Sequence, residues 1–219
     1  MTIRRLAAET LGTFFLVLVG TGTIMADDHL QGAIGPVGIA LAFGLVVMGM
    51  IYATGHLSGA HLNPAVTIGL WSTGRFPSGL VPTYLLGQIV GATTASACLA
   101  LVRTRLTGDL SLGVTTTQVG TVLGLGVEFL LTFALMFVIM AMATDDRAPV
   151  GFAGLAIGVT VAFDALVGGS LTGASMNPAR SFGPALITQR WDHHWIYWVA
   201  PIAGALAAAH LYAWIRGSA

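Results

Sequence analysis

The polar octapeptide SGAHLNPA, at residues 58–65, returns as TGASMNPA at residues 172–179, 114 positions later. The two copies share five of eight letters, and a serine-to-threonine exchange makes a sixth position similar. A single Asn-Pro pair commonly marks a turn or loop. Two matched octapeptides in otherwise apolar sequence indicate instead an internal repeat, in which the same local structure forms twice.

The sequence around the octapeptides is apolar enough to cross a membrane. Of the 219 residues, 55% are hydrophobic and 8% are charged, and the mean hydropathy is +0.84. Such values are typical of membrane proteins, in which a helix needs about 20 apolar residues to cross a hydrocarbon core of about 30 Å. Six stretches have this length: roughly 6–26, 34–55, 80–102, 119–143, 150–169 and 195–215.

Each half of the chain has the same order of features: a span that contains a glutamate, a second span, the octapeptide and a third span. The glutamates are Glu9 and Glu128. Because three spans per half is an odd number, the second half must enter the membrane upside down relative to the first. The sequence therefore predicts a single membrane domain over residues 1–219, made of inverted repeats at roughly 1–105 and 115–219.

Each octapeptide also predicts the start of a helix too short to cross the membrane. Asn63 and Asn177 are favourable N-caps, and a proline follows each at the first helical position. We expect the first helix to stop at Thr73-Gly74 and the second at Pro184; about nine residues at 1.5 Å each give about 13 Å. The expected fold is an all-α membrane protein with six transmembrane helices and two re-entrant half-helices that meet at their N-termini.

The meeting point of the half-helices is suited to a pore. Two helix N-termini produce a positive potential that repels protons and other cations. If Asn63 and Asn177 cap their helices through their side-chain oxygens, their amide N–H groups remain for a passing solute. Arg180 is unfavourable in the first turn of a membrane helix, which favours a functional role as a fixed donor at the extracellular constriction. The alternative is an ion pair between Arg180 and Asp164.

Three acidic residues within the spans have two interpretations each. Glu9 and Glu128 either accept hydrogen bonds from the re-entrant loops or carry protons in a coupled transporter, and their equivalent positions favour the first interpretation. Asp164 either accepts hydrogen bonds from residues 168–173 or faces the pore, and we favour the first. A proton-coupled small-solute transporter that uses Glu9, Glu128 or Asp164 is therefore the alternative function.

The sequence indicates no catalytic residue, metal site or cofactor. His56 and His61 flank Ser58, but no acidic residue orients either histidine as a hydrolase would require. The net charge is zero and every basic residue is arginine, so no polybasic patch points to nucleic acid. The arginines near the span ends favour an inner (plasma) membrane protein with both termini in the cytoplasm, and Tyr197 and the nearby tryptophans are expected to be interfacial anchors.

Together with AETLGTF at residues 8–14 and HWIYWVAP at residues 194–201, these motifs resemble those of the aquaporin, or major intrinsic protein, family over essentially the whole chain. The resemblance implies a right-handed bundle with one pore per chain and a homotetramer in the lipid bilayer. It implies that the paired pore motifs are Asn63, Pro64, Ala65, Asn177, Pro178 and Ala179. It implies a selectivity filter of Phe43, Ala165, Ala174 and Arg180.

The implied filter departs from that of water-selective members, which usually carry a histidine where this chain has Ala165. Two alanines leave a wider, less polar ring. Ser181, in place of the aspartate of glycerol facilitators, and the pair Tyr197-Trp198 resemble water channels instead. The run GASMNPARSFGPAL is similar to nodulin-like and bacterial members, although Phe43 differs, and we expect a bacterial or archaeal type. The resemblance implies a passive channel for water that excludes protons and ions, with glycerol, hydrogen peroxide, ammonia and uncharged arsenite as further candidate solutes.

Overall fold

A computed structural model describes residues 2–107, 110 and 112–217, and this part of the chain is helical without a strand. Six of its helices are long and apolar enough to cross a membrane, as predicted. They are α1 (Thr2–His29), α2 (Gly35–Ser58), α4 (Val81–Thr107), α5 (Gly120–Ala143), α6 (Ala153–Thr172) and α8 (Ile196–Arg216). Several run past the predicted apolar stretches, because polar residues at a span end continue the helix where the bilayer core stops.

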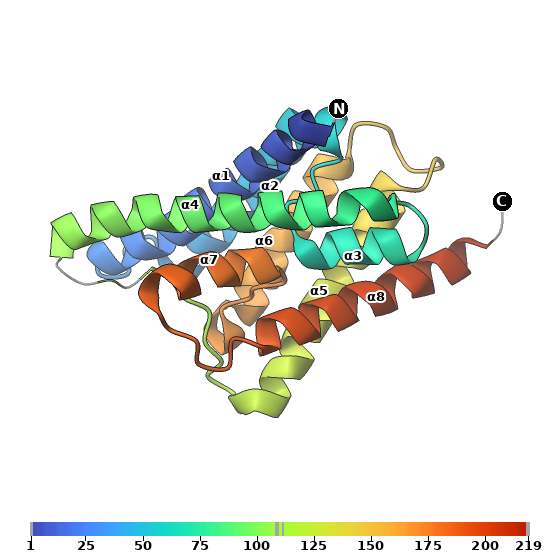
Figure 1. Ribbon diagram of the computed structural model, residues 1–219. Coiled ribbons are helices and arrows are strands. Elements are labelled where there is room, and N and C mark those ends of the chain that lie inside the picture. Colours follow the sequence, from blue (N-terminus) through green and yellow to red (C-terminus); the bar gives the residue numbers. More distant parts are fainter. Residues whose placement is uncertain (1, 108–109, 111, 218–219) are drawn as a thin grey trace.

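Two short helices, α3 (Pro64–Ser72) and α7 (Pro178–Thr188), begin within the octapeptides and lie end to end beside α4 (Figure 1). Helix α3 stops before Gly74, which has a φ of +71°, as predicted. The predicted stop of the second half-helix at Pro184 is wrong. Pro184 removes one N–H whose partner would be the Arg180 carbonyl, and the helix continues until Gln189 adopts a φ of +56°.

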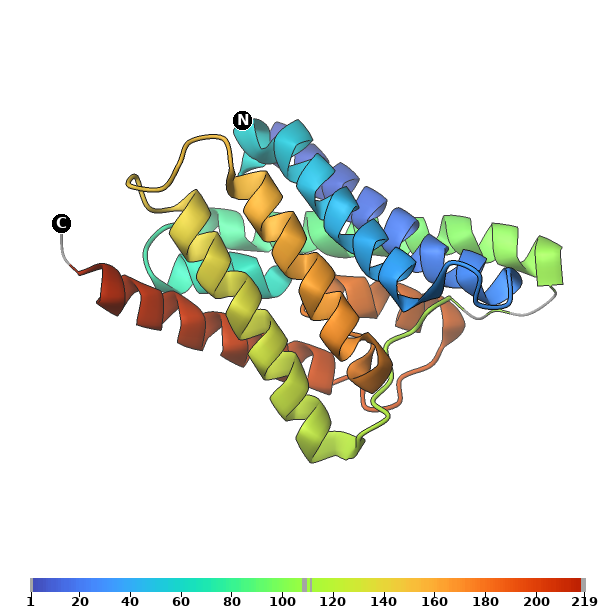
Figure 2. The same cartoon turned by 180° about the vertical axis from the view of Figure 1, so that it is seen from behind.

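The two halves are interleaved. Helix α1 packs along α4 and α5 along α8, while α2 packs against α6 between the halves. Each half-helix packs on the third span of the other half, α7 on α4 and α3 on α8. A short turn, η1 (Ser78–Leu80), precedes α4. Both termini lie at one end of the bundle, together with the loop between α5 and α6 (Figures 1 and 2).

The crossing of α2 and α6 carries the internal symmetry. A Cβ atom on Gly44 would lie 2.5 Å from the Gly158 carbonyl oxygen, and one on Gly158 would lie 2.7 Å from the Gly44 carbonyl oxygen. These glycines are 114 positions apart, the same separation as the octapeptides. Small residues allow membrane helices to approach this closely, so the paired glycines bring the two inverted halves into direct backbone contact.

Candidate channel pore

Two cavities meet at Arg180. The first, of about 230 Å³, is lined by both re-entrant loops and reaches Arg75, which follows α3, and Thr144, which follows α5. The second, of about 270 Å³, is lined by residues near the C-terminal end of α6, including Ser170 and Gly173. Arg180 lines both cavities.

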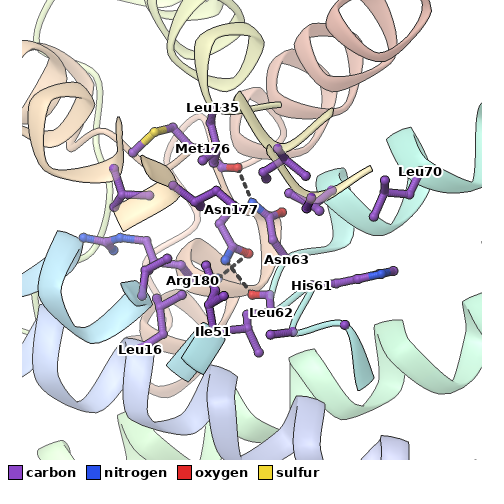
Figure 3. Close-up of a pocket in the computed structure, with 18 of the residues that line it drawn as sticks. Leu16, Ile51, His61, Leu62, Asn63, Leu70, Leu135, Met176, Asn177 and Arg180 are labelled. Atoms are coloured by element: carbon purple, nitrogen blue, oxygen red, sulfur yellow. Dashed lines mark hydrogen bonds between the residues drawn. The ribbon is translucent and has the colours of Figure 1, made fainter. Parts of the chain in front are cut away.

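The two asparagines cap their own helices and also join the halves (Figure 3). The Oδ1 atoms accept from the N–H groups of Ala65 at 2.9 Å and Ala179 at 3.0 Å, as predicted. Asn63 Nδ2 donates to the Met176 carbonyl at 2.7 Å, and Asn177 Nδ2 donates to the Leu62 carbonyl at 2.8 Å. The expectation that both N–H groups of each amide stay free is therefore wrong, since one of the two holds the opposite loop.

The loops that precede the half-helices have a strained backbone with the same pattern in both halves. Ala60 and Leu62 have φ of +49° and +53°, and Ala174 and Met176 have φ of +41° and +53°. A left-handed conformation costs a non-glycine residue of order 1 kcal/mol. Such strain persists only where surrounding contacts fix the backbone, and here the contacts come from two buried carboxylates.

Glu9 and Glu128 are fully buried and accept hydrogen bonds from the loops. Glu9 accepts from the N–H groups of residues 61 and 62 at 3.0 and 2.8 Å, and from the Ser58 hydroxyl at 2.7 Å. Glu128 accepts from the N–H groups of residues 175 and 176 at 2.9 and 2.8 Å, and from the Thr172 hydroxyl at 2.6 Å. The two carboxylates thus make equivalent contacts in the two inverted halves.

Arg180 is 1% exposed, and its guanidinium lies 5.1 Å from the centre of the Phe43 ring. Its Nη1 donates to the Gly113 carbonyl at 3.0 Å. The alternative ion pair with Asp164 does not form in the described part of the chain. Nothing in the sequence distinguished Gly113, because a backbone carbonyl carries no residue signature and the linker between the halves has no counterpart elsewhere in the repeat.

The other predicted filter residues divide into two groups. Phe43 and Ala174 line the first cavity, together with Asn63 and Asn177. Ala165 is half-buried, packs against the hydrophobic core and is not among the residues that line either cavity. The structure therefore does not bring Ala165 together with the other three predicted filter residues at either cavity.

Asp164 contradicts both interpretations given to it. Its side chain is buried, but its Oδ2 has no hydrogen-bond partner among the described residues, and it lines neither cavity. The predicted donors at residues 168–173 are mostly part of α6, which continues to Thr172, so their N–H groups are used within the helix. We find no structural role for Asp164.

Two tyrosines donate hydrogen bonds that support the loops, a role that was not predicted from the sequence. Tyr84 donates from its hydroxyl to the Ser58 carbonyl at 2.6 Å, and Tyr197 donates to the Thr172 carbonyl at 2.8 Å. The expectation that Tyr197 is an interfacial anchor is wrong, because its side chain is fully buried. The spacing of the tyrosines could have indicated their shared role, because they lie 113 positions apart, close to the spacing of the octapeptides.

Comparison with known proteins agrees with this geometry. Residues 1–212 match the Major intrinsic protein family. Aquaporin NIP1-1 of Zea mays is 44% identical over 98% of this chain and 75% of its own length. Aquaporin NIP1-4 of Oryza sativa subsp. japonica is 47% identical over 98% and 77%, and Nodulin-26 of Glycine max is 44% identical over 98% and 78%.

A solved structure also matches. The aquaglyceroporin from Plasmodium falciparum superposes with a TM-score of 0.83 at 26% identity, over 97% of this chain and 96% of that chain. The similar sequences named above are from plants, and they do not support the bacterial or archaeal type that the sequence led us to expect.

Proposed function

We propose that the pore lies between the two half-helices of a single chain, since this chain belongs to the major intrinsic protein family. Members of this family are passive channels for water and small solutes, and they are not enzymes. The position of Arg180 between two cavities that both repeats line carries this proposal. We propose further that residues 1–219 form one channel domain, because neither half-helix packs mainly within its own repeat.

The pore motifs are proposed to act at the midplane. Each asparagine retains one N–H group that is not used in joining the loops, and this group is available to a solute oxygen. The remaining members of the motifs, Pro64, Ala65, Pro178 and Ala179, begin the half-helices and are buried. The positive N-terminal ends of both helices oppose the entry of protons and other cations at this point.

The filter is proposed to consist of Phe43, Ala174 and Arg180, with Ala165 leaving its fifth-span side open. The Arg180 guanidinium donates to water or a solute hydroxyl, and its charge repels cations. Because no histidine fills the ring, we propose that small neutral solutes such as glycerol pass in addition to water. The similarity to plant NIP aquaporins supports a nodulin-like channel.

The contacts of the carboxylates argue against proton coupling. We propose that Glu9 and Glu128 hold the loops open, since their oxygens accept loop N–H and hydroxyl groups and neither residue lines the first cavity. A proton carrier must exchange protons with water during transport, and protonation would disrupt these bonds. A solute flux that follows an imposed pH gradient would contradict this assignment.

The chain is a multi-pass membrane protein, and its outer surface suits lipid or neighbouring copies. Large apolar side chains that are at least half exposed include Leu41, Val122, Leu130, Val167 and Ile215. We propose a homotetramer in the plasma membrane with both termini in the cytoplasm. This proposal is supported by the family and by the excess of arginine near the span ends that share a side with the termini.

Stopped-flow light scattering on proteoliposomes tests the channel. We expect fast shrinkage under a sucrose gradient and rapid re-swelling after the initial shrinkage under a glycerol gradient. Val161→Trp should block both, because Val161 lines the cavity, whereas Val159→Trp on the same helix should not, because Val159 is 54% exposed on the outer surface. Shrinkage no faster than that of empty liposomes would refute a water channel, and absent re-swelling would show that Phe43 and Arg180 exclude glycerol.

A further inference from the structure

A chain of three buried hydroxyl groups lies beside Arg180. Thr115 Oγ1 lies 2.8 Å from Ser181 Oγ, Ser181 Oγ lies 2.5 Å from Ser175 Oγ, and Ser175 Oγ donates to the Asn177 carbonyl at 2.9 Å. Each hydroxyl has one proton and a carbonyl can only accept, so the direction is fixed from the carbonyl backwards. Ser181 donates to Ser175, and Thr115 donates to Ser181. Their exposed fractions are 2%, 4% and 0% for Thr115, Ser175 and Ser181.

In the first repeat, the two positions equivalent to Ser175 and Ser181 are also joined by a hydrogen bond, but a different side chain supplies the third group. His61 and Thr67 stand where Ser175 and Ser181 stand in the second repeat, and His61 Nδ1 lies 3.1 Å from Thr67 Oγ1. There the third group is Gln88 of α4, whose Nε2 donates to Thr67 Oγ1 at 3.0 Å.

The second repeat has no equivalent of Gln88. The 113-residue offset that relates the two buried tyrosines places Pro201 of α8 at the position of Gln88. A proline has no side-chain donor and no backbone N–H. Thr115, from the linker between the repeats, therefore supplies the donor that α8 lacks.

The linker is attached to two adjacent residues of α7. The Gly113 carbonyl accepts from Arg180 Nη1 at 3.0 Å, and Thr115 donates to Ser181. A Cβ atom on Gly173 would lie 3.3 Å from Thr115 Cα, so the linker packs closely on the loop before α7. The Thr115 hydroxyl thus fixes the segment whose carbonyl holds the filter arginine.

We infer that Thr115 is a positioning residue for Arg180, acting through Ser181 and the Gly113 carbonyl to set the width of the filter. The inference rests on the proposed channel function. When the Thr115 hydroxyl is removed, the linker keeps the bond from the Gln118 N–H to the Leu171 carbonyl at 2.8 Å, but its only remaining hydrogen bond to α7 from the described residues 112–118 is the one between Gly113 and Arg180 itself. The Arg180 guanidinium is then less firmly held opposite Phe43, and the filter admits larger solutes more often.

The test compares water and glycerol permeability of proteoliposomes that contain Thr115→Val, which keeps the branched shape and removes the donor. Loss of one buried hydrogen bond shifts a local equilibrium by about fivefold. We expect the glycerol-to-water permeability ratio to rise by up to this factor while water flow changes little. Thr115→Ser should restore the ratio. The matched control is Thr160→Val, because Thr160 is also 2% exposed but bonds only to Ala156 of its own helix.

A double variant separates positioning from general loosening. In an Arg180→Ala background, Thr115→Val should cause no further change in the ratio, because the group that it positions is absent. A further change there, or an unchanged ratio in the single variant, would overturn the inference, as would failure of Thr115→Ser to restore the ratio.

Ser181→Ala breaks the same chain at its next hydroxyl and must give the same rise if Thr115→Val does not assemble; an unchanged ratio would again overturn the inference. Wild-type protein without water flow would overturn both the proposed function and this inference, whereas water flow with an unchanged ratio would overturn the inference alone.

Discussion

Asn63 and Asn177 divide their hydrogen-bonding capacity between structure and solute. In each side chain the oxygen caps a half-helix and one N–H group holds the opposite loop. One N–H group per asparagine remains, so these amides offer two free donors where the half-helices meet. In the proposed pore, a passing water would direct its oxygen at each asparagine, and this orientation would break the continuous donor-to-acceptor order that proton hopping along waters requires.

The carboxylates behind the loops give a prediction at the same scale. Glu128→Gln replaces one accepting oxygen with a donor and leaves a loop N–H or hydroxyl group without its partner. Hydrogen bonds to charged groups contribute about 2 kcal/mol each, so we expect a loss of stability of that order and a lower Tm in detergent. Asp164→Asn is the matched control, because the buried Oδ2 of Asp164 has no partner among the described residues. Equal Tm values for Glu128→Gln and wild type would show that the carboxylate does not support the loop.

At the scale of the elements, glycines set the distances between the helices that carry the pore. A Cβ atom on Gly91 of α4 would lie 2.3 Å from the Thr10 carbonyl oxygen of α1. One on Gly204 of α8 would lie 2.4 Å from the Phe129 carbonyl oxygen of α5. The two glycines are 113 positions apart, and their partner carbonyls are 119 apart, the same separation as Glu9 and Glu128, so each repeat fixes its first and third spans by an equivalent close approach. The glutamates on α1 and α5 reach their loops only because these helices stay in place.

Gly91→Ala and Gly204→Ala are expected to separate these helix pairs. The added methyl group overlaps a backbone oxygen that cannot move away alone, and overpacking of this kind costs about 1–3 kcal/mol. Gly49→Ala should be tolerated or slightly stabilising, because no atom lies within 4 Å of its Cβ position and alanine favours helix. Thermal unfolding monitored by size-exclusion of the purified variants measures the difference; if all three variants unfold together, the close approaches do not limit stability.

The helices could be predicted well from the sequence. Six apolar spans, with an odd number of spans in each half, and two Asn-Pro helix starts leave little choice of topology. It could not predict that α7 continues through Pro184, since the cost of one missing N–H depends on how the rest of the helix is packed. It identified the asparagines and Arg180 but not the groups that hold them. Gly113 contributes a carbonyl, and Thr115 a hydroxyl from a linker that has no counterpart in the repeat, so neither is marked by residue type or by spacing.

At the scale of the whole molecule, a charged cluster around Asp145 lies at the end of the bundle that holds the termini. Asp145, just after α5, accepts from Arg147 Nε at 2.9 Å and from the Tyr212 hydroxyl at 2.8 Å. Arg216 Nε lies 3.3 Å from the same carboxylate. The hydrogen bonds from Arg147 hold the pKa of Asp145 well below its usual range. The cluster ties the loop between α5 and α6 to α8.

This cluster predicts a specific dependence on pH. A depressed pKa means that the stability from Asp145 is fully present above the unfolded-state value, near pH 4, and is lost only as pH falls further. The difference in Tm between wild type and Asp145→Asn should therefore be constant between about pH 5 and 8 and should shrink below about pH 4. A difference that varies between pH 5 and 8 would indicate that Asp145 titrates in that range, contrary to this expectation.

The bonds between the two halves also determine when the channel can be completed during synthesis. The Met176 carbonyl that receives the Asn63 N–H lies 113 residues further along the chain. At about 5–20 residues per second, the first octapeptide waits roughly 6–23 seconds for its partner. During this interval its polar groups need water or another protein, because the bilayer core cannot satisfy them. We therefore expect the first re-entrant loop to complete its hydrogen bonds only after the second half has been inserted, so that the junction of the two half-helices forms late in assembly.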